Sequence, residues 1–246
     1  MKNLSNQTAL VTGGSRGIGA AIAKRLAKEG ANVAITYNSS PEKAELVVNE
    51  IRAAGGNAVA IRANSQDPQA VMDAVDKTAA TFGGLHILVN NAGVAILKPT
   101  EEFTVEEFDL HTSVNVRAVF AGSKAAVKHL TRGGRIITIG SCMAERVAGA
   151  GGAVYAMSKS ALIGLTKGMA RELGPRGITV NLVHPGPIDT DMNPANGEGA
   201  DWQRGLNALN EFGTVEDIAG LVAYLASPES RNITGTGITI DGGTNI

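Results

Sequence analysis

The sequence predicts an α/β fold in which seven parallel strands form one doubly wound sheet with helices on both faces. Short, β-prone apolar runs alternate along the chain with longer segments whose apolar residues recur at steps of three and four, the period of an amphipathic helix. A glycine-rich turn joins the first run to the first helical segment. No Pro-, Ser- or charge-rich linker divides the 246 residues, so we expect residues 1–246 to form a single domain with right-handed crossovers.

The first half of the chain supplies four strands and three helices. Apolar runs predict strands at 8–12, 32–36, 58–62 and 85–89. Ile18, Ile22 and Leu26 follow at helical spacing after the first strand, and the helix should end at Gly30. Proline in the first turn favours the beginning of a helix, which predicts helices over 41–54 and 68–82.

The second half continues the alternation, with one irregular interval. Helices are expected at 101–110, 113–130, 153–173 and 214–226, and strands at 134–140, 178–182 and 237–240. Residues 193–210 contain three glycines and the single tryptophan, Trp202, and show no clear period. This composition predicts a mobile substrate lid at about 191–212.

Composition excludes several classes of protein. The formal net charge of −1 argues against a nucleic-acid or anionic-membrane partner. Cys142 is the single cysteine, no charged leader with an apolar run opens the chain, and no stretch approaches the ~20 apolar residues of a membrane span. No cluster of His, Cys and carboxylates has metal-site spacing. We therefore expect a soluble cytoplasmic protein without a metal.

Tyr155 and Lys159 stand four residues apart on one predicted helix and therefore share a face. A unit positive charge at about 4 Å stabilises an anion by roughly 4 kcal/mol at an effective dielectric near 20, which corresponds to about three pKa units. The lysine should thus lower the pKa of the phenol towards neutrality, where Tyr155 can exchange a proton with a substrate oxygen. Ser141 stands just past a predicted strand, where open parallel sheets place their ligands.

The turn Gly13-x-x-x-Gly17-x-Gly19 predicts a dinucleotide site, because glycines allow backbone to approach a pyrophosphate at the amino end of the next helix. Gly13 to Gly17 also satisfy the G-x-S-x-G pattern of a hydrolase nucleophile elbow. An α/β-hydrolase is the rival enzyme class. It is disfavoured because this turn follows the very first strand and because a hydrolase gives Tyr155 and Lys159 no role.

Four motifs follow one another along the chain: the glycine-rich turn, Asn90-Asn91-Ala92-Gly93, Ser141 and Tyr155-x-x-x-Lys159. In these motifs and in their order the chain resembles the classical short-chain dehydrogenase/reductase family, and most closely its 3-oxoacyl-acyl-carrier-protein reductase branch. The resemblance covers essentially the whole chain and implies a Rossmann-type fold and a carbonyl reductase, or ketoreductase. It assigns Ser141 to the substrate carbonyl, Tyr155 as the proton donor, Lys159 to the phenol and the nicotinamide ribose, and Asn115 to a water in the proton relay.

The cofactor expected is NADP(H). Residues 37–40 at the end of the second strand include no acid that would repel a 2′-phosphate, and Arg16 stands in the turn where a cation could meet it. The resemblance extends the expected cofactor-binding set to Gly13, Ser15, Arg16, Gly17, Ile18, Gly19, Tyr37, Asn38, Ser39, Asn64, Ser65, Asn91, Ala92, Gly93, Tyr155, Lys159, Pro185, Gly186, Ile188 and Thr190.

The chain departs from the family pattern at two points. Asn64 replaces an aspartate that many members have, and thirteen residues separate Ser141 from Tyr155, one more than is usual in the reductase branch. His184 is expected to be a packed residue at a strand end and Cys142 a small core residue.

Two expectations concern partners other than the carbonyl substrate. Residues 186–197 also resemble a branch with cyclic-di-GMP-binding members, so a nucleotide-sensing regulator is the alternative function. A stripe of small residues, Ala156, Ser160, Gly164 and Gly168, together with the family resemblance, predicts a homo-oligomer, expected to be a tetramer.

Overall fold

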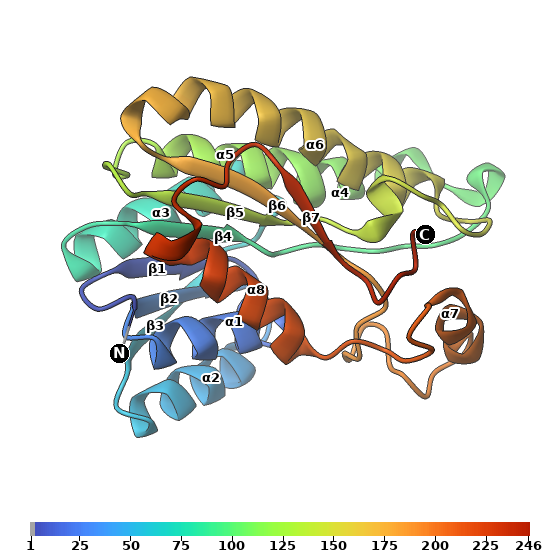
Figure 1. Cartoon of the computed structure of the whole chain (residues 1–246), viewed down its shortest axis with the longest axis horizontal. Helices are drawn as coiled ribbons and strands as arrows, with labels where there is room; N and C mark the ends of the chain where they lie inside the picture. The colour runs from blue at the N-terminus through green and yellow to red at the C-terminus, as the bar shows by residue number, and fades with distance from the viewer. Residues whose placement is uncertain (1–2) are drawn as a thin grey trace.

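The computed structural model describes residues 3–246, and its centre is a seven-stranded parallel sheet (Figure 1). The strand order is β3-β2-β1-β4-β5-β6-β7. The strands are β1 (Thr8–Val11), β2 (Asn32–Tyr37), β3 (Asn57–Arg62), β4 (Ile87–Asn90), β5 (Arg135–Ile139), β6 (Thr179–Pro185) and β7 (Gly237–Ile240). The predicted single-domain, Rossmann-type α/β fold is confirmed; the first two residues of the predicted domain lie outside the described part.

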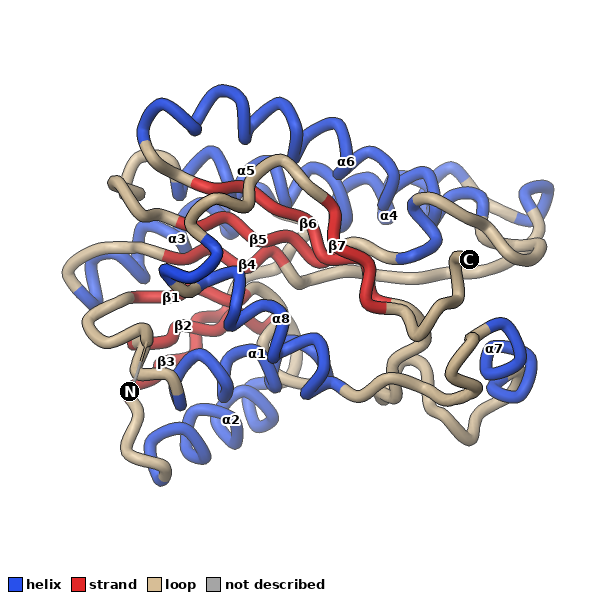
Figure 2. Tube along the Cα trace, in the orientation of Figure 1, coloured by secondary structure: helices blue, strands red, loops and turns tan. Residues whose placement is uncertain are grey.

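Helices cover both faces of the sheet, as the tube view also shows (Figure 2). One layer contains α1 (Gly17–Lys28), α2 (Pro41–Ala53) and α8 (Val215–Ala226). The other contains α3 (Pro68–Phe82), α4 (Val105–Thr112), α5 (Ala118–Ala126) and α6 (Ala153–Leu173). The short helix α7 (Ala200–Leu206) stands apart from both layers, beyond the end of the sheet.

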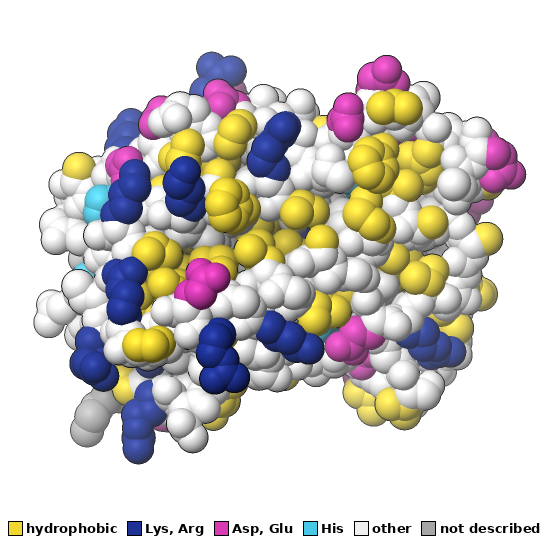
Figure 3. Space-filling view, turned by 90° about the horizontal axis from the view of Figure 1, so that it is seen from above, with side chains coloured by type: hydrophobic (Ala, Val, Ile, Leu, Met, Phe, Trp, Pro, Cys, Tyr) yellow, Lys and Arg dark blue, Asp and Glu magenta, His cyan; other side chains and the backbone are white. Residues whose placement is uncertain are grey.

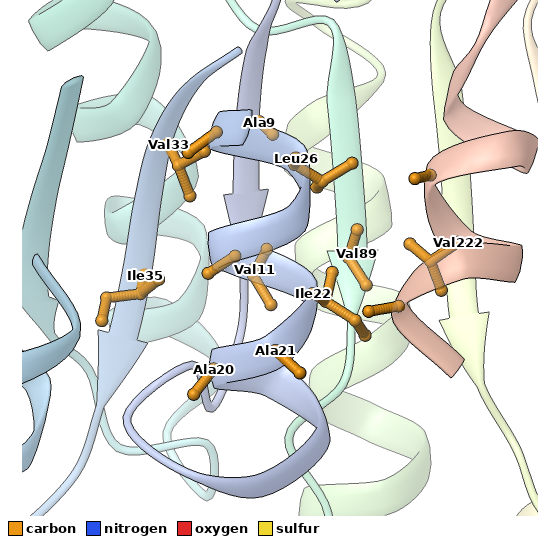
Figure 4. Close-up of a cluster of buried hydrophobic side chains, with 14 of the residues drawn as sticks. Ala9, Val11, Ala20, Ala21, Ile22, Leu26, Val33, Ile35, Val89 and Val222 are labelled. Atoms are coloured by element: carbon orange, nitrogen blue, oxygen red, sulfur yellow. The ribbon is translucent and has the colours of Figure 1, made fainter. Parts of the chain in front are cut away.

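The core lies in two apolar clusters, one on each face of the sheet. Successive strand residues point to opposite faces, so Val33 and Ile35 pack under α1 while Ala34 joins the cluster under α3 and α5. In Figure 4, Ile22 and Leu26 of α1 point towards the strands, with Val222 of α8 beside them. Because both faces are covered, the central strands are buried along their whole length, and most of their residues are apolar.

The order of the strands locates the functional edge. β1 pairs with β2 on one side and with β4 on the other, so the direction in which the chain winds the sheet reverses between β1 and β4. All strands are parallel, and their carboxyl ends therefore meet at one edge. Open sheets of this kind bind ligands in the crevice at that switch point.

Three segments differ from the sequence prediction. The expected helix over 113–130 begins with a π-helical turn, Ser113–Arg117. The helix expected over 101–110 starts at Val105, because Thr104 and Glu107 form a capping box. The irregular interval contains α7, whose start follows Gly199 in the left-handed region at φ 76°. Within residues 3–246, no helix is long and apolar enough to cross a membrane.

Candidate active site

A cavity of about 880 Å³ opens at the carboxyl ends of the central strands. All twenty residues of the predicted cofactor-binding set line it, from the glycine-rich turn at one end to Thr190 at the other. Ser141 lies on the same wall as Tyr155 and Lys159. Segments separated by more than 170 residues in the sequence therefore meet around one space, which is large enough for a dinucleotide and a small substrate.

The glycine-rich turn has the backbone that a pyrophosphate site requires. Gly13 has φ +65°, and a Cβ there would stand 2.9 Å from the Cα of Ala92. Gly17 has φ +52° and begins α1, whose N-cap, Arg16, makes no side-chain capping bond. The first N–H groups of α1 are thus left for an anion, and residues with a Cβ would close the approach. These residues fit NADP(H).

Hydrogen bonds hold the turn against the end of β4. The Thr12 hydroxyl accepts from the backbone N–H groups of Asn91 and Ala92, at 3.0 and 3.1 Å. The Asn91 amide donates in return to the carbonyls of Thr12 and Gly13, at 2.9 and 3.1 Å. The side chain of Asn91 therefore braces the glycine-rich turn, a role that the motif alone did not indicate.

Two charged residues near Arg16 were missed by the sequence analysis. Asp191 lies between two cations, with its Oδ2 atom 3.9 Å from Arg16 and 3.4 Å from the Lys43 Nζ atom. All three side chains are more than half exposed. Arg16 and Asp191 line the cavity where an adenosine 2′-phosphate is expected, and Lys43 is joined to this region through Asp191. No local pattern joins Lys43 to a residue 148 positions away.

Ser141, Tyr155 and Lys159 meet where β5 ends. Ser141 is 8% exposed, and its Oγ atom accepts from the Met143 N–H at 3.1 Å. Hydrogen bonding from the Ser141 side chain favours the phenolate form of Tyr155 and so acts to lower the pKa of the phenol. Lys159 is buried, and its Nζ atom donates to the Ile139 carbonyl at 3.0 Å and lies 5.8 Å from the centre of the Tyr155 ring.

The structure corrects the predicted electrostatics of this pair. Burial raises the pKa of Tyr155 above 10.0, although the Ser141 hydrogen bond opposes the shift. The sequence had predicted a lowered pKa, on the assumption that the ammonium faces the phenolic oxygen. Lys159 instead bonds to a backbone carbonyl and approaches the face of the ring. Burial lowers the pKa of Lys159 to about 8.

Asn115 is buried behind the cavity wall, in the π-helical turn. Its amide donates to the Val94 carbonyl at 2.9 Å and to the Ser158 hydroxyl at 3.0 Å, and its Oδ1 atom accepts from the Val94 N–H at 2.9 Å. Among the four predicted catalytic residues, it is the one that does not line the cavity. Its side chain fixes the segment that follows β4.

The remaining wall of the cavity is mostly apolar. Trp202 of α7 reaches Gly149, where an added Cβ would stand 3.0 Å from the indole ring. The apolar residues on this side are Val94, Leu97, Met143, Ala148, Met192, Trp202 and Leu206. Cys142 is buried, and burial raises the pKa of its thiol to about 11, so it is a small core residue. Residues 3–246 contain no cluster of three metal-binding side chains.

Comparison with known proteins gives matches over nearly the whole chain. The family model described as enoyl-(acyl carrier protein) reductase matches residues 13–245. A short-chain dehydrogenase from Burkholderia cenocepacia J2315, solved in complex with NADP, has a TM-score of 0.98 and 58% identity over 99% of this chain and 100% of that one. Other similar structures hold NADPH, and NADP(H) is the cofactor of this protein.

Two curated relatives carry different functional names. The cyclic-di-GMP-binding biofilm dispersal mediator protein of Escherichia coli (strain K12) is 44% identical over 242 residues, 98% of each chain. The 3-oxoacyl-[acyl-carrier-protein] reductase FabG of Staphylococcus aureus (strain N315) is 42% identical over 240 residues, 96% of this chain and 97% of that one.

Proposed function

Because this chain belongs to the classical short-chain dehydrogenase/reductase family, we propose that it is an NADPH-dependent carbonyl reductase acting on ketones or 3-oxoacyl groups. The reaction is reversible, so the protein also oxidises the corresponding alcohol. One observation carries the proposal. Ser141, Tyr155 and Lys159 all line the cavity that the glycine-rich turn also lines.

In the proposed mechanism the two hydroxyl groups act on the same substrate oxygen. Bound NADPH supplies the hydride for the carbonyl carbon. Tyr155 gives its proton to the oxygen as negative charge develops there. Ser141 donates a hydrogen bond to the same oxygen, and such donors are effective because they are already oriented.

Lys159 and Asn115 support this pair. We assign the Lys159 ammonium to the nicotinamide ribose and to the charge next to the phenol. Asn115 holds Val94 and, in the proposal, positions a water in the proton relay that replenishes Tyr155. The twenty cavity residues predicted as cofactor-binding are proposed to hold NADP(H), with Arg16 at the 2′-phosphate.

The substrate enters, in this proposal, beneath a lid formed by residues 191–212. Trp202 and Leu206 of α7 supply apolar walls, and the Trp202 ring lies against the Gly149 segment across the cavity. Arg146 also lines the cavity, but its guanidinium donates to the Thr244 carbonyl, and the apolar side chains around it favour a substrate with an apolar body next to its carbonyl group. Substrate identity depends on these walls, which discriminate by only ~1–3 kcal/mol per methylene.

The direct test is carbonyl-dependent oxidation of NADPH by the purified wild-type protein. The panel should contain simple ketones, diketones and 3-oxoacyl thioesters, and NADH should be tested in parallel. We expect turnover with at least one class and preference for NADPH. A protein that binds NADPH tightly but oxidises it with no member of the panel would overturn the proposal.

The second candidate is a regulator that binds cyclic-di-GMP without catalysis, and the name of the E. coli relative favours it. Both candidates need the nucleotide-binding fold, so the fold does not distinguish them. Calorimetric titration with cyclic-di-GMP, with and without saturating NADPH, separates the two. Binding without any carbonyl turnover supports the regulator.

We further propose that the protein is a cytoplasmic homo-oligomer. Phe108 of α4, Phe120 of α5 and Met157 of α6 are each more than a third exposed. Figure 3 looks down onto the layer that contains these helices and shows apolar side chains gathered along it between the charged groups. The free Cys142 is consistent with a reducing compartment.

A further inference from the structure

The side chain of His184 makes one hydrogen bond, and its partner is the backbone carbonyl of Ser141. The residue lies near the end of β6 and is completely buried. Its Nδ1 atom is 2.7 Å from the Ser141 carbonyl oxygen. A carbonyl oxygen only accepts, so Nδ1 carries the proton and the imidazole is the Nδ1–H tautomer.

The surroundings hold the ring in this position. A Cβ at Gly140 would stand 2.9 Å from Nδ1, and a Cβ at Gly237 would stand 2.7 Å from Nε2. The imidazole therefore lies between the backbones that follow β5 and begin β7. Two positions without side chains make this placement possible.

The state of the second ring nitrogen, Nε2, indicates that histidine at position 184 does not serve the stability of the fold. Nε2 is buried and has no hydrogen-bond partner within residues 3–246. A buried polar atom without a partner destabilises the folded state, and an apolar side chain of similar size would avoid that cost. The bond to Ser141 is the feature that distinguishes histidine from such a side chain.

The bond bears on the direction of the Ser141 hydroxyl group. Ser141 has an extended backbone, and its Oγ atom accepts from the Met143 N–H, so that its own hydroxyl proton can be donated to another group. The next carbonyl, of Cys142, is held from the other side by the Asn245 amide at 2.9 Å. The carbonyls of Ser141 and Cys142 are thus both held by side chains, and Ser141 lines the cavity.

We propose that His184 is a positioning residue for the reduction: its Nδ1–H holds the Ser141 carbonyl and so orients the Ser141 hydroxyl towards the substrate oxygen. The proposal rests on the carbonyl reductase function proposed above. His184 itself does not touch substrate or cofactor.

Kinetics of single and double variants test this coupling. His184→Leu removes the donor and should lower kcat by about 10- to 100-fold, the size of effect that misplacing a reacting group produces. His184→Asn keeps an N–H in a similar position and should recover most of the activity. The dissociation constant for NADPH should stay within about twofold in both variants, because the cofactor contacts are unchanged.

The double variant distinguishes positioning from general damage. In a Ser141→Ala background, His184→Leu should lower kcat by less than about twofold, because the group that it orients is already absent. An equal loss in both backgrounds would overturn the proposal. His86→Leu is the matched control, because the His86 Nδ1 atom also bonds to backbone, the Thr8 N–H at 3.0 Å, at the opposite end of the sheet. We expect this control to leave kcat unchanged.

Two measurements on the NADPH complex do not depend on turnover. Nitrogen NMR of the histidine rings, assigned with His184→Asn, should show the Nδ1–H tautomer for His184; the Nε2–H tautomer would contradict the proposal. Hydrogen exchange at the Met143 amide should be faster in His184→Leu than in wild type. An inactive wild-type protein that passes both tests would remove the proposed function but keep the positioning role, whereas an active protein that fails them would do the reverse.

Discussion

The Nζ atom of Lys159 lies over the ring of Tyr155, 5.8 Å from its centre, and donates to the carbonyl of Ile139. The charge therefore reaches the phenol through the ring face and not by a direct bond to its oxygen. Burial acts on the two residues in opposite ways, because it disfavours the charged form of each. The pKa of Tyr155 rises, which keeps the proton on the phenol, and the pKa of Lys159 falls to about 8.

The first prediction is the pH dependence of the reduction. The Tyr155 phenol keeps its proton well beyond neutrality, whereas the Lys159 ammonium is charged below about pH 8 and neutral above it. We expect kcat for carbonyl reduction to fall as the pH rises through about 8. Initial rates from pH 6 to pH 10 at saturating NADPH measure this. A rate that increases across the same interval would contradict the assignment.

The second prediction concerns stability. The pKa of Lys159 is 10.5 in the unfolded chain and about 8 in the folded protein, so folding with a charged Lys159 costs roughly 3 kcal/mol at pH 7. The unfolded chain binds more protons, so wild-type stability rises from pH 8 towards pH 10.5. Lys159→Met should therefore unfold at a higher temperature than wild type at pH 7. The loss of the hydrogen bond to the Ile139 carbonyl will reduce this gain in stability.

Thermal unfolding of the two proteins at pH 7 and pH 10 measures this difference. A gain of about 2 kcal/mol would raise Tm by several degrees in a domain of this size. The difference in Tm between Lys159→Met and wild type should be smaller at pH 10, where Lys159 is neutral in the folded protein. A gap that is independent of pH would mean that packing, and not charge, sets the difference.

The third prediction is the cofactor preference. Arg16→Ala should lower kcat/KM with NADPH by at least about tenfold and leave NADH nearly unaffected, because a charge-assisted bond to phosphate is lost. Asp191→Asn should have the opposite effect and strengthen the binding of NADPH. It removes a carboxylate that competes for Arg16 and Lys43, and exposed pairs of this kind are worth ~0.2–1 kcal/mol. NADPH should then bind up to about fivefold more tightly.

Dissociation constants for both nucleotides, measured by fluorescence titration, check the pair of variants. Glu42→Gln is a useful control, because Glu42 lies in the first turn of α2 and forms no ion pair with Arg16 or Lys43. Equal efficiency of the wild-type protein with NADH and NADPH would refute the role of Arg16.

The fourth prediction separates the enzyme from the regulator. Tyr155→Phe removes the proton donor and should lower kcat by about 100-fold or more while NADPH affinity remains almost unchanged. Lys159→Ala should weaken both, because the ammonium serves the phenol and the ribose. Steady-state kinetics and NADPH titration on the same preparations measure the two effects. If neither substitution alters any output of the protein, the catalytic assignment is wrong.

Sequence patterns were sufficient for the fold because each element is defined locally. β2 and β5 are short runs rich in β-branched residues, and α3 and α6 keep a regular apolar period. The family motifs also indicated the cavity residues, because three of the four motifs follow the carboxyl end of a strand and the fourth, Tyr155-x-x-x-Lys159, lies in α6 next to that edge. Local patterns in the sequence could not predict contacts between motifs that lie far apart in the chain. Asp191 meets Lys43 across 148 residues, and only the folded chain brings them together.

The spacing of residues in the sequence also did not predict the directions in which side chains point. The period of α6 places Tyr155 and Lys159 on one face, but it does not show that Nζ turns to Ile139. The structure divides the predicted stripe of small residues into two parts, which the spacing did not distinguish. Ala156 is buried and the Ser160 hydroxyl bonds to Ala144, whereas Gly164 and Gly168 face open space. The exposed part of the stripe thus begins at Gly164.

The fifth prediction is the assembly that this exposed surface supports. Phe120 is 53% exposed on α5, and a Cβ at Gly164 or Gly168 would meet nothing within 4 Å, so a second chain can approach α5 and α6 closely. We expect wild type to be a homo-oligomer, and most simply a tetramer. Phe120→Lys should shift it to smaller species, because a buried unpaired charge is costly.

Multi-angle light scattering at micromolar concentration measures the mass of each species. Leu46→Lys is the matched control, because Leu46 is 61% exposed on α2 in the opposite layer of helices, and its substitution should leave the mass unchanged. If the control variant dissociates and Phe120→Lys does not, the interface lies over α2 instead. A wild-type protein that is monomeric at these concentrations would show that the apolar surface over α4, α5 and α6 does not pair with a second copy.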